Sequence, residues 1–135
     1  MAIKLLGSKF TKVSAFRDPE FSGTLNMNQN INIKKIDKYK SEFSKQESLK
    51  INYSYIIDYK ELGKIEIEGI LFIGGDNKLQ KELLKNWIDK NYNTPEQVAI
   101  MNLIIQKASV KALVLEEELS LPVHFKLPSL QPKKE

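Results

Sequence analysis

The chain has 135 residues, of which 41% are hydrophobic and 28% are charged, a composition typical of a folded domain and not of a globally disordered chain. It has no cysteine and one histidine, which excludes a disulfide scaffold, a cysteine nucleophile and any metal site built on several of these ligands. The 21 lysines and arginines and 17 aspartates and glutamates give a net charge of +4, which permits an anionic partner without requiring one.

The first third of the chain predicts two strands separated by a turn. Residues 9–16 are a weak strand candidate, which the turn-prone residues 17–20 close. Residues 21–33 then carry apolar side chains on odd positions and mostly asparagine or serine on even positions. Such alternation predicts a long strand with one buried and one wetted face. The charged residues 35–48 predict a long connection to the next strand.

A β-hairpin is predicted over residues 49–73. Apolar and polar side chains alternate from Leu49 to Tyr59, and residues 60–63 predict a turn in which Gly63 supplies the left-handed conformation. The return strand alternates at first but ends in the apolar run 70–73, so we expect that end to be covered on both faces. Because no link contains a clear crossover helix, all four strands are predicted to be antiparallel.

Two helices are predicted after a break at residues 74–77. The first is predicted to end near residue 91, and its apolar stripe is Leu79, Leu83, Leu84, Trp87 and Ile88. In the second, Thr94 is the predicted N-cap, Pro95 takes the first position and Gln97 completes a capping box. One face of this helix carries Val98, Met101, Ile105, Ala108, Ala112 and Leu115. The apolar surface is widened by Ile100, Leu103, Ile104 and Leu113, so we expect the helix to pack on the sheet and on a second surface.

These elements predict an α+β fold, a four-stranded antiparallel sheet followed by two helices packed on one face. We expect one domain over residues 1–128 and a short polar tail at residues 129–135. The second helix and the proline-punctuated residues 119–128 carry more apolar surface than a small two-layer domain can bury. A homo-oligomer, a bound polypeptide or both would cover that surface.

The sequence offers little for catalysis. His124 has no acid near it in sequence, Glu66 and Glu68 are expected to be solvated on an outward strand face, and residues 74–75 read as a plain turn. We therefore expect no catalytic residues, no metal, no cofactor and no enzymatic activity. No signal peptide and no run of about 18 uninterrupted apolar residues is evident, so a cytoplasmic protein without membrane insertion is expected.

Three segments resemble the SecB-type chaperones of protein export. Residues 53–59 (YSYIIDY) look like the third strand of that family, and residues 65–73 (IEIEGILFI) look like the fourth. Residues 119–125 (LSLPVHF) look like the apolar segment that follows the last long helix. The resemblance covers residues 5–127. It implies an ATP-independent holdase, a dimer or tetramer, that binds unfolded or nascent polypeptides.

The resemblance also indicates candidate polypeptide-binding residues. They are Phe21, Leu25, Met27, Phe72, Trp87, Leu121 and Phe125. The family is strongly acidic, which serves docking to the translocation motor ATPase, whereas this chain is basic. A SecB-like protein that stabilises one partner, such as an antitoxin, is compatible with that charge. A basic β-sheet adaptor for RNA or a ribonucleoprotein also stays open, although the lysines of residues 34–40 are interleaved with acids and the chain has a single arginine.

Overall fold

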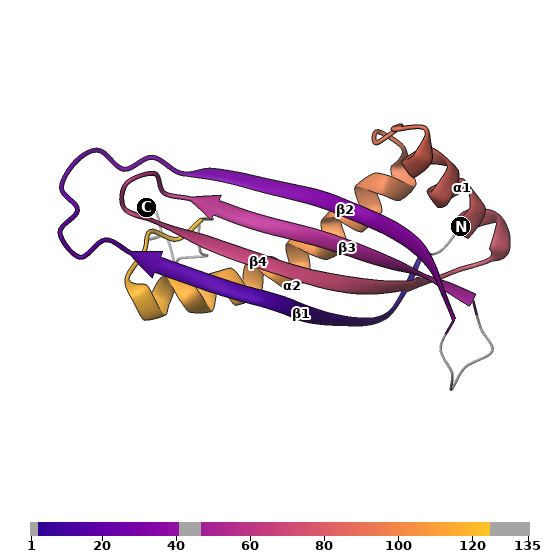
Figure 1. Cartoon of the computed structure of the whole chain (residues 1–135), viewed down its shortest axis with the longest axis horizontal. Coiled ribbons are helices and arrows are strands. Elements are labelled where there is room, and N and C mark those ends of the chain that lie inside the picture. The colour runs from indigo at the N-terminus through magenta and orange to yellow at the C-terminus, as the bar shows by residue number, and fades with distance from the viewer. Residues whose placement is uncertain (1–2, 41–46, 125–135) are drawn as a thin grey trace, which may run out of the picture.

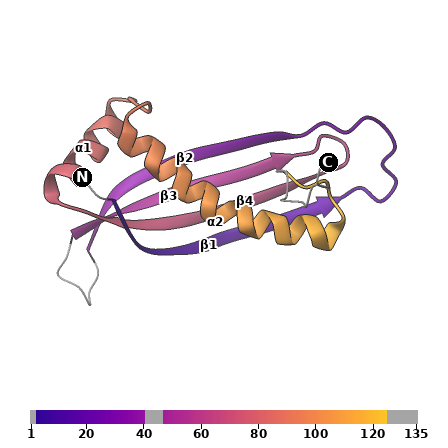
Figure 2. The ribbon, with the colours of Figure 1, turned by 180° about the vertical axis from the view of Figure 1, so that it is seen from behind.

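The computed structural model describes residues 3–40 and 47–124. Its elements follow the chain as β1 (Lys4–Arg17), β2 (Asn28–Lys40), β3 (Glu47–Asp58), β4 (Gly63–Gly74), α1 (Asn77–Ile88) and α2 (Pro95–Leu119). The strands form one antiparallel sheet in the order β1-β4-β3-β2. Figures 1 and 2 show α2 lying along one face of this sheet and α1 at one end of it. The predicted α+β fold is therefore confirmed.

The core lies between α2 and the facing side of β3 and β4. Alternate residues of the two central strands are fully buried there, and β4 contributes Ile65, Ile67, Leu71 and Ile73. From α2 the inward stripe is Gln97, Ile100, Ile104, Ala108, Ala112 and Glu116. The two alanines leave room for the helix to approach the sheet closely. Burial of this apolar surface is the main stabilising contribution to the fold.

Only part of the wide apolar surface predicted for α2 packs on the sheet. Ile100, Ile104, Ala108 and Ala112 are fully buried, whereas Val98 and Ile105 are 50% and 38% exposed. Because α2 is apolar nearly all round, its periodicity did not decide between two neighbouring stripes. Within the described residues, α2 is also the one helix whose length and composition would suffice to cross a membrane, with a mean hydropathy of 1.6 over its best window and 22% of that window buried. Its inward stripe packs on the sheet and includes two polar residues, as expected of a core helix.

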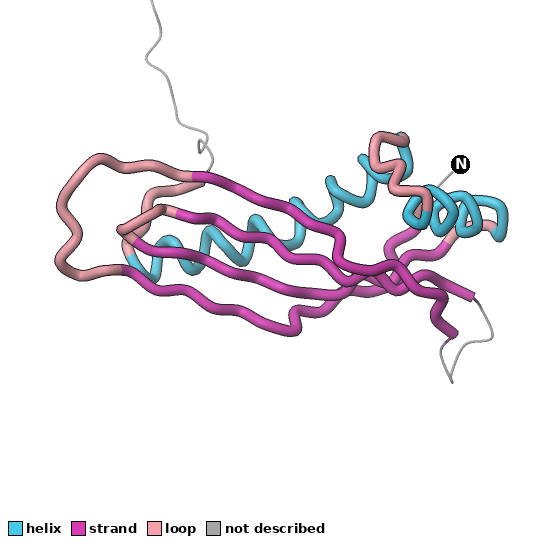
Figure 3. The backbone as a smooth tube through the Cα atoms, turned by 45° about the horizontal axis from the view of Figure 1, so that its top comes forward, coloured by secondary structure: helices cyan, strands magenta, loops and turns pink. Residues whose placement is uncertain are grey.

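The second strand begins and ends later than predicted. Residues 21–27 form the loop that joins β1 to β2 at the end of the sheet away from α1, drawn in pink in Figure 3. β2 then pairs with β3 from Asn28 to Lys40, so that it includes residues 35–40 of the predicted connection. A register shift between Ile33 and Lys35 moves the inward position from odd to even residues, so Ile36 is buried. A β-bulge of this kind looks like the end of a strand in the sequence.

The β3–β4 hairpin is where predicted, but its left-handed residue is Lys60, with φ of 62°, and not Gly63. Gly63 is instead required by the approach of β1, because a Cβ there would lie 2.2 Å from the carbonyl oxygen of Phe16. The predicted covering of the apolar end of β4 is confirmed in part, since Ile70 is 7% exposed and the Phe72 ring packs against Tyr39.

Candidate binding groove

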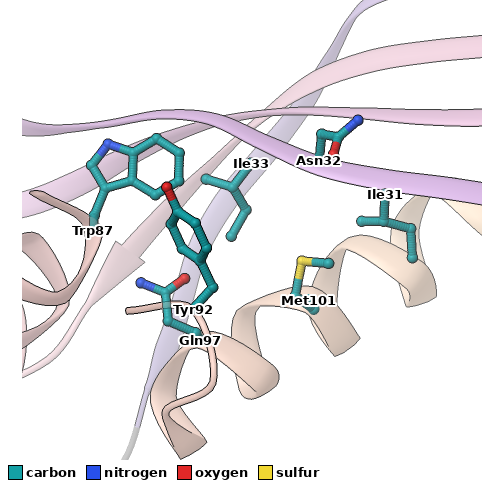
Figure 4. Close-up of a pocket in the computed structure, with 7 residues that line it drawn as sticks. All are labelled: Ile31, Asn32, Ile33, Trp87, Tyr92, Gln97 and Met101. Atoms are coloured by element: carbon teal, nitrogen blue, oxygen red, sulfur yellow. The ribbon is translucent and has the colours of Figure 1, made fainter. Parts of the chain in front are cut away.

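A groove of about 330 Å³ opens between β2, α1 and α2, within the range of roughly 300–1,000 Å³ common for ligand pockets. None of its lining residues is charged: Ile31, Asn32, Ile33, Trp87, Tyr92, Gln97 and Met101. Figure 4 shows the two isoleucines pointing from β2 toward the groove and Met101 rising from α2 to meet them. The surface is therefore mainly apolar, with the polar atoms of an asparagine, a glutamine and two aromatic residues.

The link between the helices builds one wall of this groove. α1 ends at Ile88, and Thr94 caps the start of α2 by accepting a hydrogen bond from the Gln97 backbone N–H (3.2 Å). Between them, Lys90 takes a left-handed conformation with φ of 59° that turns the chain back. The ring of Tyr92 consequently packs on Trp87, with 5.5 Å between ring centroids. Tyr92 is nevertheless 49% exposed, so it covers the groove from the solvent side.

Gln97 is the one buried side chain of the groove whose polar atoms have no partner in the described part of the chain. It is 1% exposed, and neither Nε2 nor Oε1 makes a hydrogen bond. The capping box predicted at this position is thus half formed: Thr94 caps the helix, but the Gln97 carboxamide does not return to it. An unsatisfied buried polar group costs about 1–3 kcal/mol. The folded domain therefore carries a local energetic cost at the groove.

A second buried glutamine shows that the fold can satisfy such a group. Gln80 of α1 is 7% exposed, and its Nε2 donates to the carbonyl oxygens of Glu47 and Gly75, both at 3.0 Å. It lies outside the groove. The unpaired carboxamide is therefore a feature of Gln97 and not of buried glutamines in this domain.

A second, wider hollow lies between β2, β3 and α2, lined by Gln29, Tyr55, Ile105, Gln106, Ser109, Val110 and His124. Met101, Ile105 and Ser109 are one helical turn apart, so both hollows lie on one flank of α2. From Gln97 to Ser109 the helix rises about 18 Å, the length of roughly five residues of extended chain. β2 runs beside this flank as an edge strand, and within residues 3–40 and 47–124 it pairs with β3 alone.

A buried hydrogen-bond network closes the far end of the second hollow. Glu116 is 0% exposed, and its carboxylate accepts from the Tyr59 hydroxyl and from His124 Nδ1, the latter at 2.5 Å. Ser109 Oγ lies 2.5 Å from His124 Nε2. The expectation that His124 has no acid near it is therefore wrong, since α2 brings Glu116 to the histidine ring.

Burial raises the pKa of Tyr59 well above its ordinary value of 10.0, and the adjacent Glu116 carboxylate raises this pKa further. Burial also raises the pKa of Tyr55, whose hydroxyl donates to Gln29 Oε1 at 3.1 Å. The network extends to the backbone, since Gln29 Nε2 donates to the His124 carbonyl (3.0 Å) and the Tyr59 hydroxyl lies 3.0 Å from the Pro122 carbonyl. These contacts fasten residues 122–124 to the sheet.

Ser109, His124 and Glu116 follow the order of a serine–histidine–acid triad. Ser109, however, lies inside α2, where the backbone N–H groups around it are used by the helix and cannot form an oxyanion hole. The contacts among these three side chains are instead those of an anchor that holds residues 122–124 against α2 and the sheet. In the described residues no group of three or more histidine, aspartate or glutamate side chains is placed to hold a metal ion.

The structure disperses the seven residues predicted to bind polypeptide. Trp87 lies in the groove, Phe21 is partly buried beside the core, and Leu25 and Met27 are exposed in the β1–β2 loop. Phe72 packs under Tyr39 and Lys9, Leu121 is buried, and Phe125 lies outside the described residues, as does the predicted tail 129–135. The groove residues absent from that set come from β2, the α1–α2 link and α2. The sequence signal for this groove was the pair of aromatic residues on either side of the break between the helices, Trp87 and Tyr92.

The lysines near β2 are partly neutralised. Lys34 pairs with Glu68, and Lys35 lies 3.4 Å from Asp37. The Lys34 ammonium holds the pKa of Glu68 below its usual range. Lys12 pairs with Glu66 at 3.2 Å. Three lysines of the sheet are therefore paired with neighbouring carboxylates.

No family model and no curated protein sequence matches this chain. Among solved structures, it matches the Mycobacterium tuberculosis SecB-like chaperone Rv1957, determined in complex with a ChAD peptide from the Rv1956 HigA1 antitoxin. The match has a TM-score of 0.51 and 10% sequence identity, and it covers 97% of this chain and 93% of that chain. The chain has a SecB-like fold. The predicted resemblance is confirmed at the level of architecture.

Proposed function

We propose that this protein is an ATP-independent chaperone that binds unfolded polypeptides in the groove between β2, α1 and α2. The observation that carries the proposal is an uncharged, largely apolar groove running beside an edge strand. Apolar burial is non-directional, so such a surface accepts many side chains, and the flexible Met101 adapts to them. The open edge of β2 can add main-chain hydrogen bonds that do not depend on client sequence.

Trp87 gives a direct test, because it is the single tryptophan of the chain and lies in the groove. A permanently unfolded, tryptophan-free polypeptide is titrated into the protein without nucleotide while Trp87 emission is recorded. We expect a saturable change in emission and, in parallel, slower aggregation of an unfolding client. A folded, tryptophan-free protein of similar size is the control. Absence of any binding contradicts the proposal, whereas binding without a change at Trp87 places the client elsewhere.

A dedicated stabiliser of one protein is the second candidate. The observation that favours it is the solved SecB-like chaperone Rv1957, whose complex holds a peptide from an antitoxin. The two candidate functions differ in the range of polypeptides that the protein binds. Unrelated unfolded polypeptides that bind with similar affinity support a general holdase, whereas tight binding of one sequence alone supports a dedicated partner.

We expect the chain to form a homo-oligomer through the surface between β1 and α2. That surface exposes apolar side chains from both elements, with Phe10 41%, Val110 65% and Val114 43% exposed. Val110 also lines the second hollow, whereas Phe10 and Val114 line only the β1–α2 surface. Sedimentation velocity of the wild type and of Val114→Asp tests this expectation, with a shift of the variant toward monomer as the predicted result.

A further inference from the structure

We propose that the Gln97 carboxamide hydrogen-bonds to a main-chain amide of the bound polypeptide. This inference rests on the proposed function and names the chemical group that the groove recognises. Its first support is the side chain itself, which is 1% exposed and lines the groove with both polar atoms unpaired in the described part of the chain.

Orientation is the second support. Figure 4 shows the carboxamide of Gln97 directed from the first turn of α2 toward Tyr92 and Trp87, on the groove side of the helix. Folding did not use this group for the capping box, although the Thr94 half of the box is present. The carboxamide is held at the groove wall by a well-capped helix end, a rigid base for a binding group.

Chemical complementarity identifies the ligand. A primary carboxamide has an acceptor and a donor side by side, and the peptide group carries the matching N–H and C=O. Among the described residues no charged side chain lines the groove, so neither a carboxylate nor an ammonium ion would find a counter-charge in this part of the chain. Because every client carries the same backbone, pairing with it adds affinity without restricting sequence, as a binder of unfolded chains needs.

Access to Gln97 involves Tyr92. Its ring covers the solvent side of the carboxamide, yet Tyr92 is 49% exposed and belongs to the short link between the helices. Displacement of this side chain by the entering client would uncover the amide. The apolar walls supplied by Ile33 and Met101 would then surround the new hydrogen bonds and exclude water from them.

The experiment compares Gln97→Met with Gln80→Met. Methionine keeps the length of the side chain and removes its hydrogen-bonding groups. At Gln97 we expect a higher Tm, because no protein hydrogen bond is lost, together with about three- to tenfold weaker binding of an unfolded polypeptide. At Gln80 we expect a lower Tm, because two hydrogen bonds are lost, and unchanged affinity.

A ligand series provides a second measurement that does not depend on how the variants fold. Each peptide of the series, derived from one bound client, carries a single N-methylated peptide bond. One position should weaken binding to the wild type and leave binding to Gln97→Met unchanged, as expected if the two changes remove the same contact.

The outcomes separate this inference from the function on which it rests. If the wild type binds no unfolded polypeptide, the proposed function fails and the inference fails with it. If the wild type binds but Gln97→Met binds equally well or more tightly, the proposed function is retained and the inference about Gln97 is overturned. A lowered Tm for Gln97→Met without loss of affinity also overturns it, since that result indicates a purely structural role.

Discussion

The two ends of α2 each bury a polar side chain in the stripe that faces the sheet. At the C-terminal end Glu116 accepts hydrogen bonds from Tyr59 and His124, whereas at the N-terminal end Gln97 has no partner among the described residues. Both are nearly inaccessible, at 0% and 1% exposure. A satisfied buried network rigidifies, while an unsatisfied group weakens the fold. The comparison distinguishes an anchor from a binding group within one helix.

The largest expected effect is at the anchored end. Glu116→Ala removes the acceptor of two buried donors, so we expect a loss of about 3–5 kcal/mol in the free energy of unfolding. Urea denaturation measures it, with Glu117→Ala, an exposed neighbour on the same helix, as the matched control. A cost at Glu116 no larger than that at Glu117 would show that the network does not hold this end of the fold.

Alkaline pH tests the same network through its tyrosines. The folded state raises the pKa of Tyr53, Tyr55 and Tyr59 above the unfolded value of 10.0, chiefly by burial. The unfolded chain therefore releases protons first, and stability that is complete below pH 10 falls as the pH rises beyond it. Phenolate absorbance and circular dichroism should change together. Tyr59→Phe should reduce this pH dependence. If all tyrosines ionise while the protein stays folded, the predicted coupling between tyrosine ionisation and unfolding is contradicted.

Ser109 contributes a smaller part of the anchor. Ser109→Ala leaves the His124–Glu116 contact in place and removes one hydrogen bond, so we expect a cost of about 1 kcal/mol. Client binding should persist in this variant. If Ser109→Ala is as damaging as Glu116→Ala, the serine and not the carboxylate is the centre of the network.

The smallest expected effect is outside the buried stripe. Lys34 and Glu68 pair on the sheet with side-chain exposures of 50% and 25%, so Lys34→Met should cost less than about 1 kcal/mol. Lys34 lowers the pKa of Glu68, so the contribution is present above the usual carboxyl range near pH 4.5 and is lost as the pH falls below it. Added salt should diminish it, and a large salt-independent cost would refute this view of the pair.

Local pattern was sufficient for much of the fold. The β3–β4 hairpin followed from alternation and a short turn. Both helices followed from their apolar periodicity, and the start of α2 followed also from its cap residues. The sequence did not reveal the bulge between Ile33 and Lys35, because an inserted residue breaks the alternation that marks a strand. The left-handed residue of the turn is Lys60, whereas Gly63 is needed where β1 approaches β4, a tertiary contact that local pattern does not reveal.

The candidate site was less accessible to sequence reasoning. Trp87 was among the candidates that the family resemblance indicated, but Gln97 was explained as a capping residue, a role that its side chain does not take. The His124–Glu116 contact spans eight residues across a helix end and a turn, where no periodicity applies. Which groups of a helix meet a partner depends on its rotation about its axis, and that rotation is set by packing.

Amide hydrogen exchange with and without an unfolded polypeptide tests the central claim most directly. Both edges of the sheet are open, β2 beside the groove and β1 on the other side, so the two strands are internal controls for each other. The account predicts that the client slows exchange in β2, around Ile31–Ile33, and in the first turns of α2, with no change in β1. Protection confined to β1, or no protection at all, would contradict it.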